Sequence, residues 1–94
     1  MIARVWRCEI AVDRGDDYDM FARERSLHTF QAHHGFRGAA FLGRGPARTV
    51  LPLWSTTSDI EALERSVLYR KTVDAIMSAG FILRVEPALT AEVL

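Results

Sequence analysis

The chain of 94 residues contains a single cysteine, Cys8, and a single lysine, Lys71. A lone cysteine excludes an internal disulfide and favours a reducing compartment, so we expect the protein in the cytoplasm. No apolar run approaches the roughly 18 residues that cross a membrane, and the first residues open directly into a strand pattern. The formal net charge is zero and the isoelectric point is about 6.8. This balance indicates neither a nucleic-acid partner nor an anionic membrane surface.

Metal and nucleotide motifs are also missing. The three histidines do not repeat at a metal-binding helical spacing, and we interpret them as surface or capping residues. The glycine-rich segment 43–46 lies between two strand-like runs and is not followed by a helix, unlike a nucleotide-binding loop. The sequence therefore predicts that the protein holds no metal, haem or flavin.

What is present is an alternation of strand and helix patterns in one uninterrupted domain, residues 1–94. β-branched and aromatic residues predict strands at 2–12, on both sides of a turn at 43–46, and at 81–86 before Pro87. A helix is expected from an N-cap at Asp16 to about residue 32. A second helix should start at Thr56 or Ser58, restart near residues 65–66 and end at Gly80.

The order strand, helix, strand, strand, helix, strand is that of ferredoxin-like α+β domains. It predicts a βαββαβ fold with a four-stranded antiparallel sheet, the first and third strands at its centre and both helices on one face. The other face would then expose apolar side chains, and an apolar tail at residues 88–94 needs a surface to pack on. We expect a homodimer in which two sheets meet face to face, with the tail against the partner or along a sheet edge.

Four segments resemble the antibiotic biosynthesis monooxygenase family, in order and spacing over nearly the whole chain. They are Met1-Ile2-Ala3-Arg4-Val5-Trp6-Arg7, Gly35-Phe36-Arg37-Gly38-Ala39, Leu53-Trp54-Ser55-Thr56 and Glu86-Pro87. The resemblance implies a dimeric α/β barrel with one pocket in each subunit, between the sheet and the helices. It also implies, for some members, oxidation of phenols or quinols by molecular oxygen without metal or flavin. The haem-degrading branch needs an asparagine on the first strand and a haem-ligating histidine on the last helix, and neither is found here.

The candidate catalytic residues are charged or hydroxyl-bearing side chains on the strands and helices that are expected to surround a buried pocket. Arg7 and Arg84 lie on strands expected to be buried, and Tyr69 follows the change of apolar stripe on the second helix. A cation or phenol there would stabilise a developing oxyanion, and His28 could act as the base. The alternative interpretation is that these residues form salt bridges to nearby glutamates such as Glu9, Glu86 or Glu24.

The walls of the expected pocket are aromatic and basic. Phe21 shares an arc of the first helix with Arg25 and His28, and Phe41 lies on the strand before the turn. An aromatic substrate could stack on either phenylalanine. Trp54 is the fourth pocket candidate, although its ring could instead anchor the corner between strand and helix.

Two functions remain open at this stage. One is a cofactor-independent monooxygenase acting on a small aromatic metabolite of the phenol or quinol type. The other is a non-catalytic dimeric module that binds a ligand or serves a structural role. A pocket with convergent polar groups would favour the enzyme, whereas a pocket filled by the protein's own side chains would favour the module.

Overall fold

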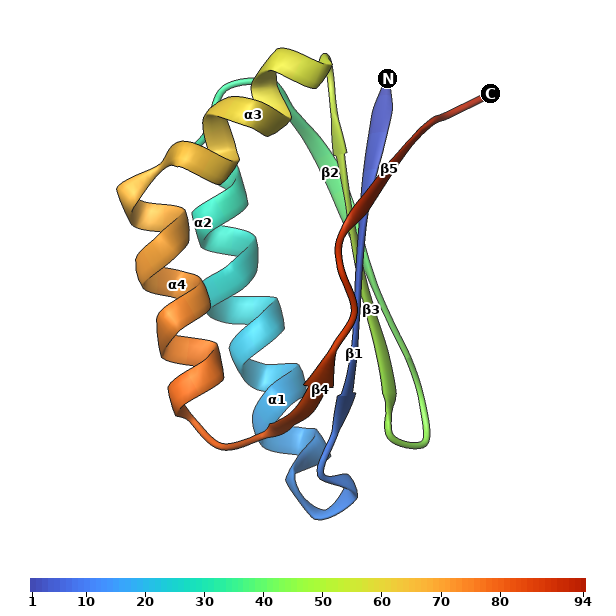
Figure 1. The fold of residues 1–94 in the computed structure, drawn as a ribbon, viewed down its shortest axis with the longest axis vertical. Helices are drawn as coiled ribbons and strands as arrows, with labels where there is room; N and C mark the ends of the chain where they lie inside the picture. Colours follow the sequence, from blue (N-terminus) through green and yellow to red (C-terminus); the bar gives the residue numbers. More distant parts are fainter.

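A computed structural model describes residues 1–94 as one antiparallel sheet covered by helices on one face only (Figure 1). The strands are β1 (Ile2–Ile10), β2 (Phe36–Arg44), β3 (Ala47–Trp54), β4 (Ile82–Val85) and β5 (Leu89–Glu92). The path through the sheet is β2-β3-β1-β4, and β5 also pairs with β1. The ferredoxin-like arrangement and the central positions of β1 and β3 are therefore as predicted.

The sheet has five strands rather than the predicted four, because part of the tail, expected only to pack on a surface, forms a further strand after Pro87. β4 pairs with the end of β1 at Cys8–Ile10, and β5 pairs with its beginning at Ile2–Val5. Both segments thus follow the same edge of β1. The apolar tail was expected either against the partner or along a sheet edge. It lies along the edge of β1.

The helices are interrupted at two places. The first helical stretch comprises α1 (Gly15–Phe21), a π-helical segment (Ala22–Ser26) and α2 (Leu27–Gln31), after a 3-10 turn at Val12–Arg14. The predicted N-cap at Asp16 is wrong, because α1 already begins at Gly15 and no side chain caps it. The second stretch breaks where predicted, into α3 (Thr57–Arg65) and α4 (Val67–Ser78). Ser66 Oγ accepts a hydrogen bond from the Tyr69 N–H at 3.1 Å and so caps α4.

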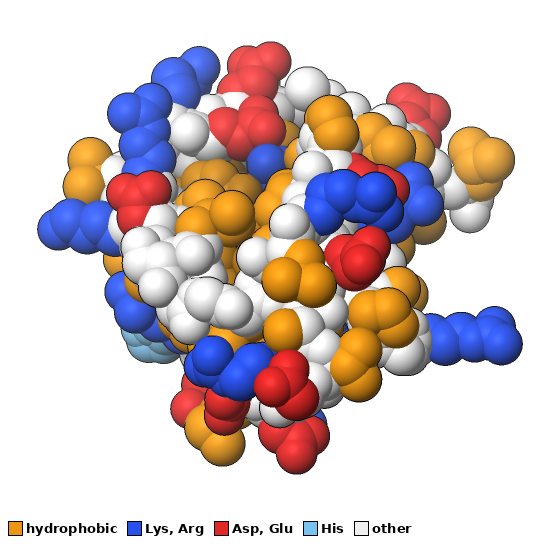
Figure 2. Space-filling model, turned by 60° about the horizontal axis from the view of Figure 1, so that its bottom comes forward, with side chains coloured by type: hydrophobic (Ala, Val, Ile, Leu, Met, Phe, Trp, Pro, Cys, Tyr) orange, Lys and Arg blue, Asp and Glu red, His pale blue; other side chains and the backbone are white.

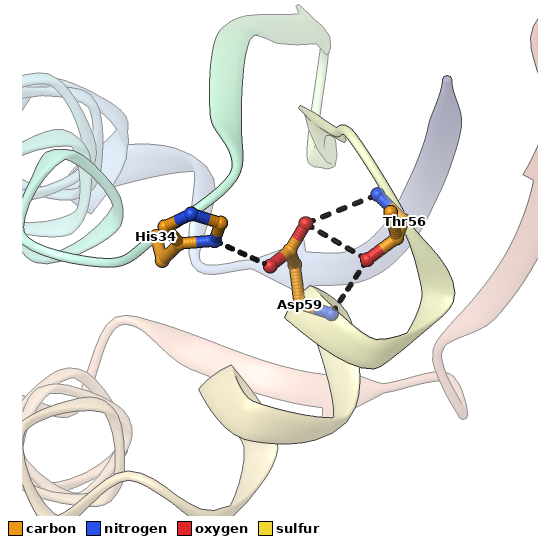
Figure 3. A network of polar contacts seen from close by, with 3 residues as sticks. All are labelled: His34, Thr56 and Asp59. Atoms are coloured by element: carbon orange, nitrogen blue, oxygen red, sulfur yellow. Dashed lines mark hydrogen bonds and ion pairs between the residues drawn. The ribbon is translucent and has the colours of Figure 1, made fainter.

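Thr56 and Asp59 form the predicted capping box at the start of α3 (Figure 3). The Asp59 N–H donates to Thr56 Oγ1 at 3.2 Å, and Asp59 Oδ2 accepts from the Thr56 N–H at 3.1 Å. His34 Nδ1 donates to the other carboxylate oxygen at 2.9 Å. Gly35 follows with φ +83°, and a Cβ there would collide with Asp59. A glycine is thus needed for the loop between α2 and β2 to approach the start of α3.

The two faces of the sheet differ in their surroundings. On the helix side, one apolar cluster contains Cys8, Ile10 and Tyr18, and a second contains Val50 and Trp54. Because side chains alternate along a strand, Val5, Leu51 and Leu53 point to the opposite face, which no helix covers (Figure 1). No helix of the structure is long and apolar enough to cross a membrane.

The capping box predicts how stability responds to acid. Hydrogen bonds from His34 and Thr56 hold the pKa of Asp59 below its usual range. The stabilisation is therefore present above the unfolded-state pKa of about 4 and is lost as the pH falls through the lower folded-state value. Asp59→Asn should make the acid limb of a stability-versus-pH curve shallower than in the wild type. Glu61→Gln, on the same helix and exposed, is the control, and equal slopes for both variants would contradict the assignment.

Candidate functional site

A cavity with a volume of about 300 Å³ lies between α1 and the end of the β2–β3 hairpin. Its lining consists of Tyr18, Asp19, Ala22, Arg23, Phe41, Leu42, Gly43, Gly45, Arg48, Thr49 and Val50. We call it the outer cavity. Figure 2 brings this end of the molecule forward and shows hydrophobic and charged side chains side by side on its surface. The outer cavity thus combines apolar walls with a few polar groups, as small-molecule sites do.

Arg48 is the most firmly held polar residue of the outer cavity. Its Nε donates to Asp19 Oδ1 at 2.8 Å, and its Nη2 donates to Oδ2 at 3.3 Å. Nη1 donates to the carbonyl oxygens of Gly45 and Ala47 at 2.7 and 2.9 Å. The hydrogen bonds to Asp19 raise the pKa of the guanidinium. A guanidinium has five N–H donors, so these four bonds leave one donor of Nη2 free.

Glycine makes room for this arginine. Gly43 lies opposite Arg48 in the β2–β3 ladder, and a Cβ on Gly43 would come within 2.9 Å of the arginine side chain. The sequence analysis placed Gly43 in the turn, whereas the turn residue with positive φ is Gly45, at +55°. The absence of a side chain at Gly43 therefore leaves the space in which the Arg48 side chain lies across β2.

Tyr18 is 2% exposed, and its hydroxyl has no hydrogen-bond partner in the protein. Burial raises the pKa of this hydroxyl far above its usual range, and the neighbouring Cys8 raises it further. The Cys8 thiol is itself buried, which raises its pKa as well. Tyr18 is thus a neutral phenol that lies beside the Cys8 thiol, a weak acceptor, and forms no hydrogen bond of ordinary geometry. A buried polar group in this state usually has a functional or solvent partner.

A second, smaller cavity lies between the sheet and the helices, with a volume of about 40 Å³. Its lining is Arg4, Trp6, Tyr18, Ser26, Phe30, Val50, Pro52, Tyr69, Thr72, Val73 and Ile76. We call it the inner cavity. Arg4 is buried there, 5.3 Å from the centre of the Tyr69 ring, and forms an ion pair with Glu64 at 3.2 Å. Thr72 and Thr29 share a hydrogen bond of 2.6 Å, so the polar groups here are largely paired within the protein.

The π-helical segment supplies side chains to both cavities. Ala22 and Arg23 line the outer cavity, and Ser26 lines the inner one. Single π-helical turns inside α-helices occur often at functional sites, because the wider turn reorients side chains that a regular helix would place elsewhere. The irregular backbone therefore coincides with the two cavities.

Two of the residues predicted for the site line these cavities. Phe41 lines the outer cavity and Tyr69 lines the inner one. Trp54 is fully buried in the second apolar cluster, where its ring meets Phe30 and Phe36 edge-on at 6.1 and 5.5 Å. This agrees with the alternative interpretation of Trp54 as an anchor of the strand-to-helix corner.

The other five predicted residues line neither the outer nor the inner cavity, but Arg7 and Arg84 together line a third cavity of about 250 Å³. Arg7 and Arg84 face the uncovered side of the sheet, where Arg7 pairs with Glu86 at 3.4 Å and Arg84 pairs with Glu9 at 3.1 Å. The expected pocket on the helix side therefore does not contain them, because strand alternation turns them away from it. Of the remaining three, His28 and Arg25 are exposed, Arg25 lies over the ring of Phe21 at 5.4 Å, and Phe21 packs on Phe81.

Four residues of the outer cavity were not among those predicted for the site: Tyr18, Asp19, Arg23 and Arg48. The sequence does contain an indication of Arg48. It belongs to a strand of β-branched and apolar residues, and alternation places it on the same face as the apolar Val50 and Trp54. An arginine on the buried face of a strand needs a partner or a cavity. The acidic partner, Asp19, lies 29 residues away and only the fold brings it close.

Comparison with known proteins finds similarity in structure but not in sequence. No protein-family model and no curated protein sequence matches the chain. SnoaB, a cofactor-independent oxygenase from Streptomyces nogalater, superposes with a TM-score of 0.83 at 10% identity, over 99% of this chain and 92% of SnoaB. The chain has the fold of this oxygenase.

Two further solved structures, each described as a "putative antibiotic biosynthesis monooxygenase", share this fold. The protein from Nitrosomonas europaea has a TM-score of 0.76 at 11% identity, over 100% of this chain and 99% of its own. The protein from Deinococcus radiodurans has a TM-score of 0.80 at 8% identity, over 99% of this chain and 92% of its own. The ferredoxin-like subunit fold expected from the resemblance is therefore confirmed.

The packing of Gly43 against Arg48 gives a prediction that a double-mutant cycle can check. Gly43→Ala should destabilise the wild type by about 1 kcal/mol, because the added methyl group displaces the arginine. In an Arg48→Ala background the same change should be neutral or slightly stabilising, because alanine orders a strand better than glycine. Denaturant unfolding measures both steps. Equal effects in the two backgrounds would show that Gly43 does not accommodate Arg48.

Proposed function

We propose that the protein oxygenates a small phenol or quinol with molecular oxygen, without a bound cofactor, in the outer cavity. The single observation that carries this proposal is the convergence of Tyr18, Asp19, Arg23 and Arg48 on a cavity with aromatic and aliphatic walls. The shared fold with a cofactor-independent oxygenase supports it. No group of three or more histidine, cysteine, aspartate or glutamate side chains is placed to hold a metal ion.

The reaction needs no external reductant, because the substrate supplies the electrons. A quinol with one free ring position and one O₂ give a hydroxyquinone and one water. One oxygen atom becomes a ring hydroxyl and the other leaves as water, while the ring loses four electrons. A phenol and one O₂ likewise give a quinone and one water, and here the inserted oxygen atom becomes the second carbonyl oxygen. The protein has to bind the ring, favour its ionised form and stabilise the charge that develops on oxygen.

The outer cavity offers groups for each of these tasks. The free Nη2 donor of Arg48 and the exposed guanidinium of Arg23 would attract an ionised ring oxygen. The neutral Tyr18 hydroxyl would donate a further hydrogen bond, and the Asp19 carboxylate would take up the substrate proton. Phe41 provides a ring on which an aromatic substrate would stack.

Tyr69 has a different role in this proposal from the one its sequence position predicts. It lines the inner cavity beside Arg4, and its ring contacts that guanidinium. It would therefore fix the back of the site rather than meet the reacting oxygen. His28, Arg7 and Arg84, which lie outside both cavities, have no part in the proposed reaction.

The non-catalytic alternative also has an observation in its favour. Four of the five donors of Arg48 are already used within the protein, and Arg4 is paired with Glu64. A site whose charges are satisfied internally can serve a structural role. Activity measurements decide between the two functions.

Oxygen consumption with a panel of phenols and quinols tests the catalytic proposal. Tyr18→Phe should lower kcat/KM by about 100-fold, because a donor to the developing oxyanion is lost. Arg23→Gln should raise KM by about tenfold, because a charge that attracts the substrate is removed. Arg70→Gln, an exposed arginine on α4 outside both cavities, is the control and should behave as wild type. Absence of oxygen uptake with every substrate would leave the non-catalytic module as the function.

We further propose that the protein is a homodimer joined through the uncovered sheet face. This face carries Val5, Leu51 and Leu53, and the exposed Leu42 and Leu89 lie on the strands beside them. Removing such apolar area from water is worth roughly 25 cal/mol per Å². In a chain with only 16 of 94 residues buried, a second copy is the natural cover.

Leu51→Glu places a charge in the middle of this face and should convert the dimer to a monomer at micromolar concentration. Sedimentation velocity measures the change. Val67→Glu, at an exposed position on α4, which lies on the opposite side of the sheet, should leave the dimer intact. A wild type that sediments as a monomer would refute the dimer, and a Leu51→Glu variant that remains dimeric would place the interface elsewhere.

The location in the cell remains a prediction from composition. The only cysteine is buried and unpaired in the structure. A chain without a disulfide is compatible with the reducing cytoplasm, which is where we propose that the protein acts.

A further inference from the structure

Two side chains, Tyr18 and Val50, line both the outer and the inner cavity. They come from different elements, Tyr18 from α1 and Val50 from β3, and their exposed fractions are 2% and 6%. Every other residue that lines the outer or the inner cavity lines only one of these two. These two side chains therefore stand between a space of about 300 Å³ and a space of about 40 Å³.

The ladder of the sheet explains this position of Val50. Val50 pairs with Phe41 on β2 and with Trp6 on β1, so the three side chains form one row across the helix-facing side. Phe41 lines only the outer cavity and Trp6 lines only the inner one. The row thus runs from the outer cavity through Val50 to the inner cavity, and Tyr18 covers the same boundary from the helix side.

We propose that Val50 and Tyr18 form a wall that sets the depth of the substrate site and restricts it to phenols of one or two rings. This inference rests on the proposed function. The outer cavity is at the lower limit of volumes found for small-molecule sites, about 300–1,000 Å³. The inner cavity could admit only a few atoms, since a single water needs about 10–15 Å³ of such space. A third ring would have to occupy the inner cavity, and the wall prevents that.

Val50 is the part of the wall that can be changed without touching the proposed chemistry. Its side chain has no polar atom, so it neither binds the substrate oxygen nor moves a proton. Shortening it to alanine removes two methyl groups between the cavities. Val73 offers a matched control, because it lines only the inner cavity. Val73→Ala enlarges that cavity by the same two methyl groups and leaves the wall in place.

Binding of 2-naphthol and 2-anthrol, which differ by one ring, tests the proposal by NMR titration of the intact protein. The wild type should bind 2-naphthol more tightly. Val50→Ala should raise the affinity for 2-anthrol relative to 2-naphthol by about tenfold, equivalent to about 1.4 kcal/mol, because the third ring becomes buried. In that variant 2-anthrol should shift the indole signal of Trp6, in the inner cavity, but not that of Trp54. Val73→Ala should keep the wild-type preference.

The outcomes separate the two proposals. If 2-naphthol binds to the wild type but Val50→Ala gains nothing for 2-anthrol, the wall is refuted and the proposed function stands. If neither compound binds to any variant, the aromatic site itself is refuted. If Val50→Ala does not fold, Tyr18→Leu opens the boundary from the helix side and should show the same gain in relative affinity. A gain in Val73→Ala equal to that in the wall variant would also overturn the proposal.

Discussion

The ion pair between Arg48 and Asp19 joins the end of the β2–β3 hairpin to α1 and gives the outer cavity its form. A partly buried guanidinium loses some of its hydration, and here a carboxylate and two backbone carbonyls replace it. Gly43 supplies the space and the hairpin turn supplies the carbonyls. The consequence is a cavity with polar and apolar walls in which one guanidinium donor is left for a ligand.

Much of the fold follows from local patterns in the sequence. Thr56 with Asp59 and Ser66 with the Tyr69 N–H are interactions between residues three apart, so their effect on the helix starts is visible without tertiary structure. The order of elements then limits the sheet to few topologies. The fifth strand escaped prediction because its pairing with β1 depends on a contact between the two ends of the chain, and only weak alternation marks residues 89–92.

The site was harder to predict because it depends on which face of each strand is buried. Alternation along β1 places Arg4, Trp6 and Cys8 on one face and Arg7 and Glu9 on the other, but both faces mix charged and apolar groups. Sequence alone therefore gives no reason to choose the face of Arg4 over that of Arg7. The structure resolves this through partners at long range, Glu64 for Arg4 and Asp19 for Arg48.

Tyr18 connects the two properties that distinguish this region, a polar group without a partner and a boundary between two cavities. An unsatisfied buried hydroxyl costs about 1–3 kcal/mol, so a phenylalanine would serve better if the ring were only a wall. Conversely, a hydroxyl needed only for binding a ligand could lie in the open part of the cavity, where water would hydrogen-bond to it and the desolvation cost would be smaller. Tyr18 has both features. Its ring separates the outer cavity from the inner one. Its hydroxyl lacks a hydrogen-bond partner in the protein. A ligand oxygen or an ordered water at the wall would supply one, which is why the size of the site and its chemistry depend on the same residue.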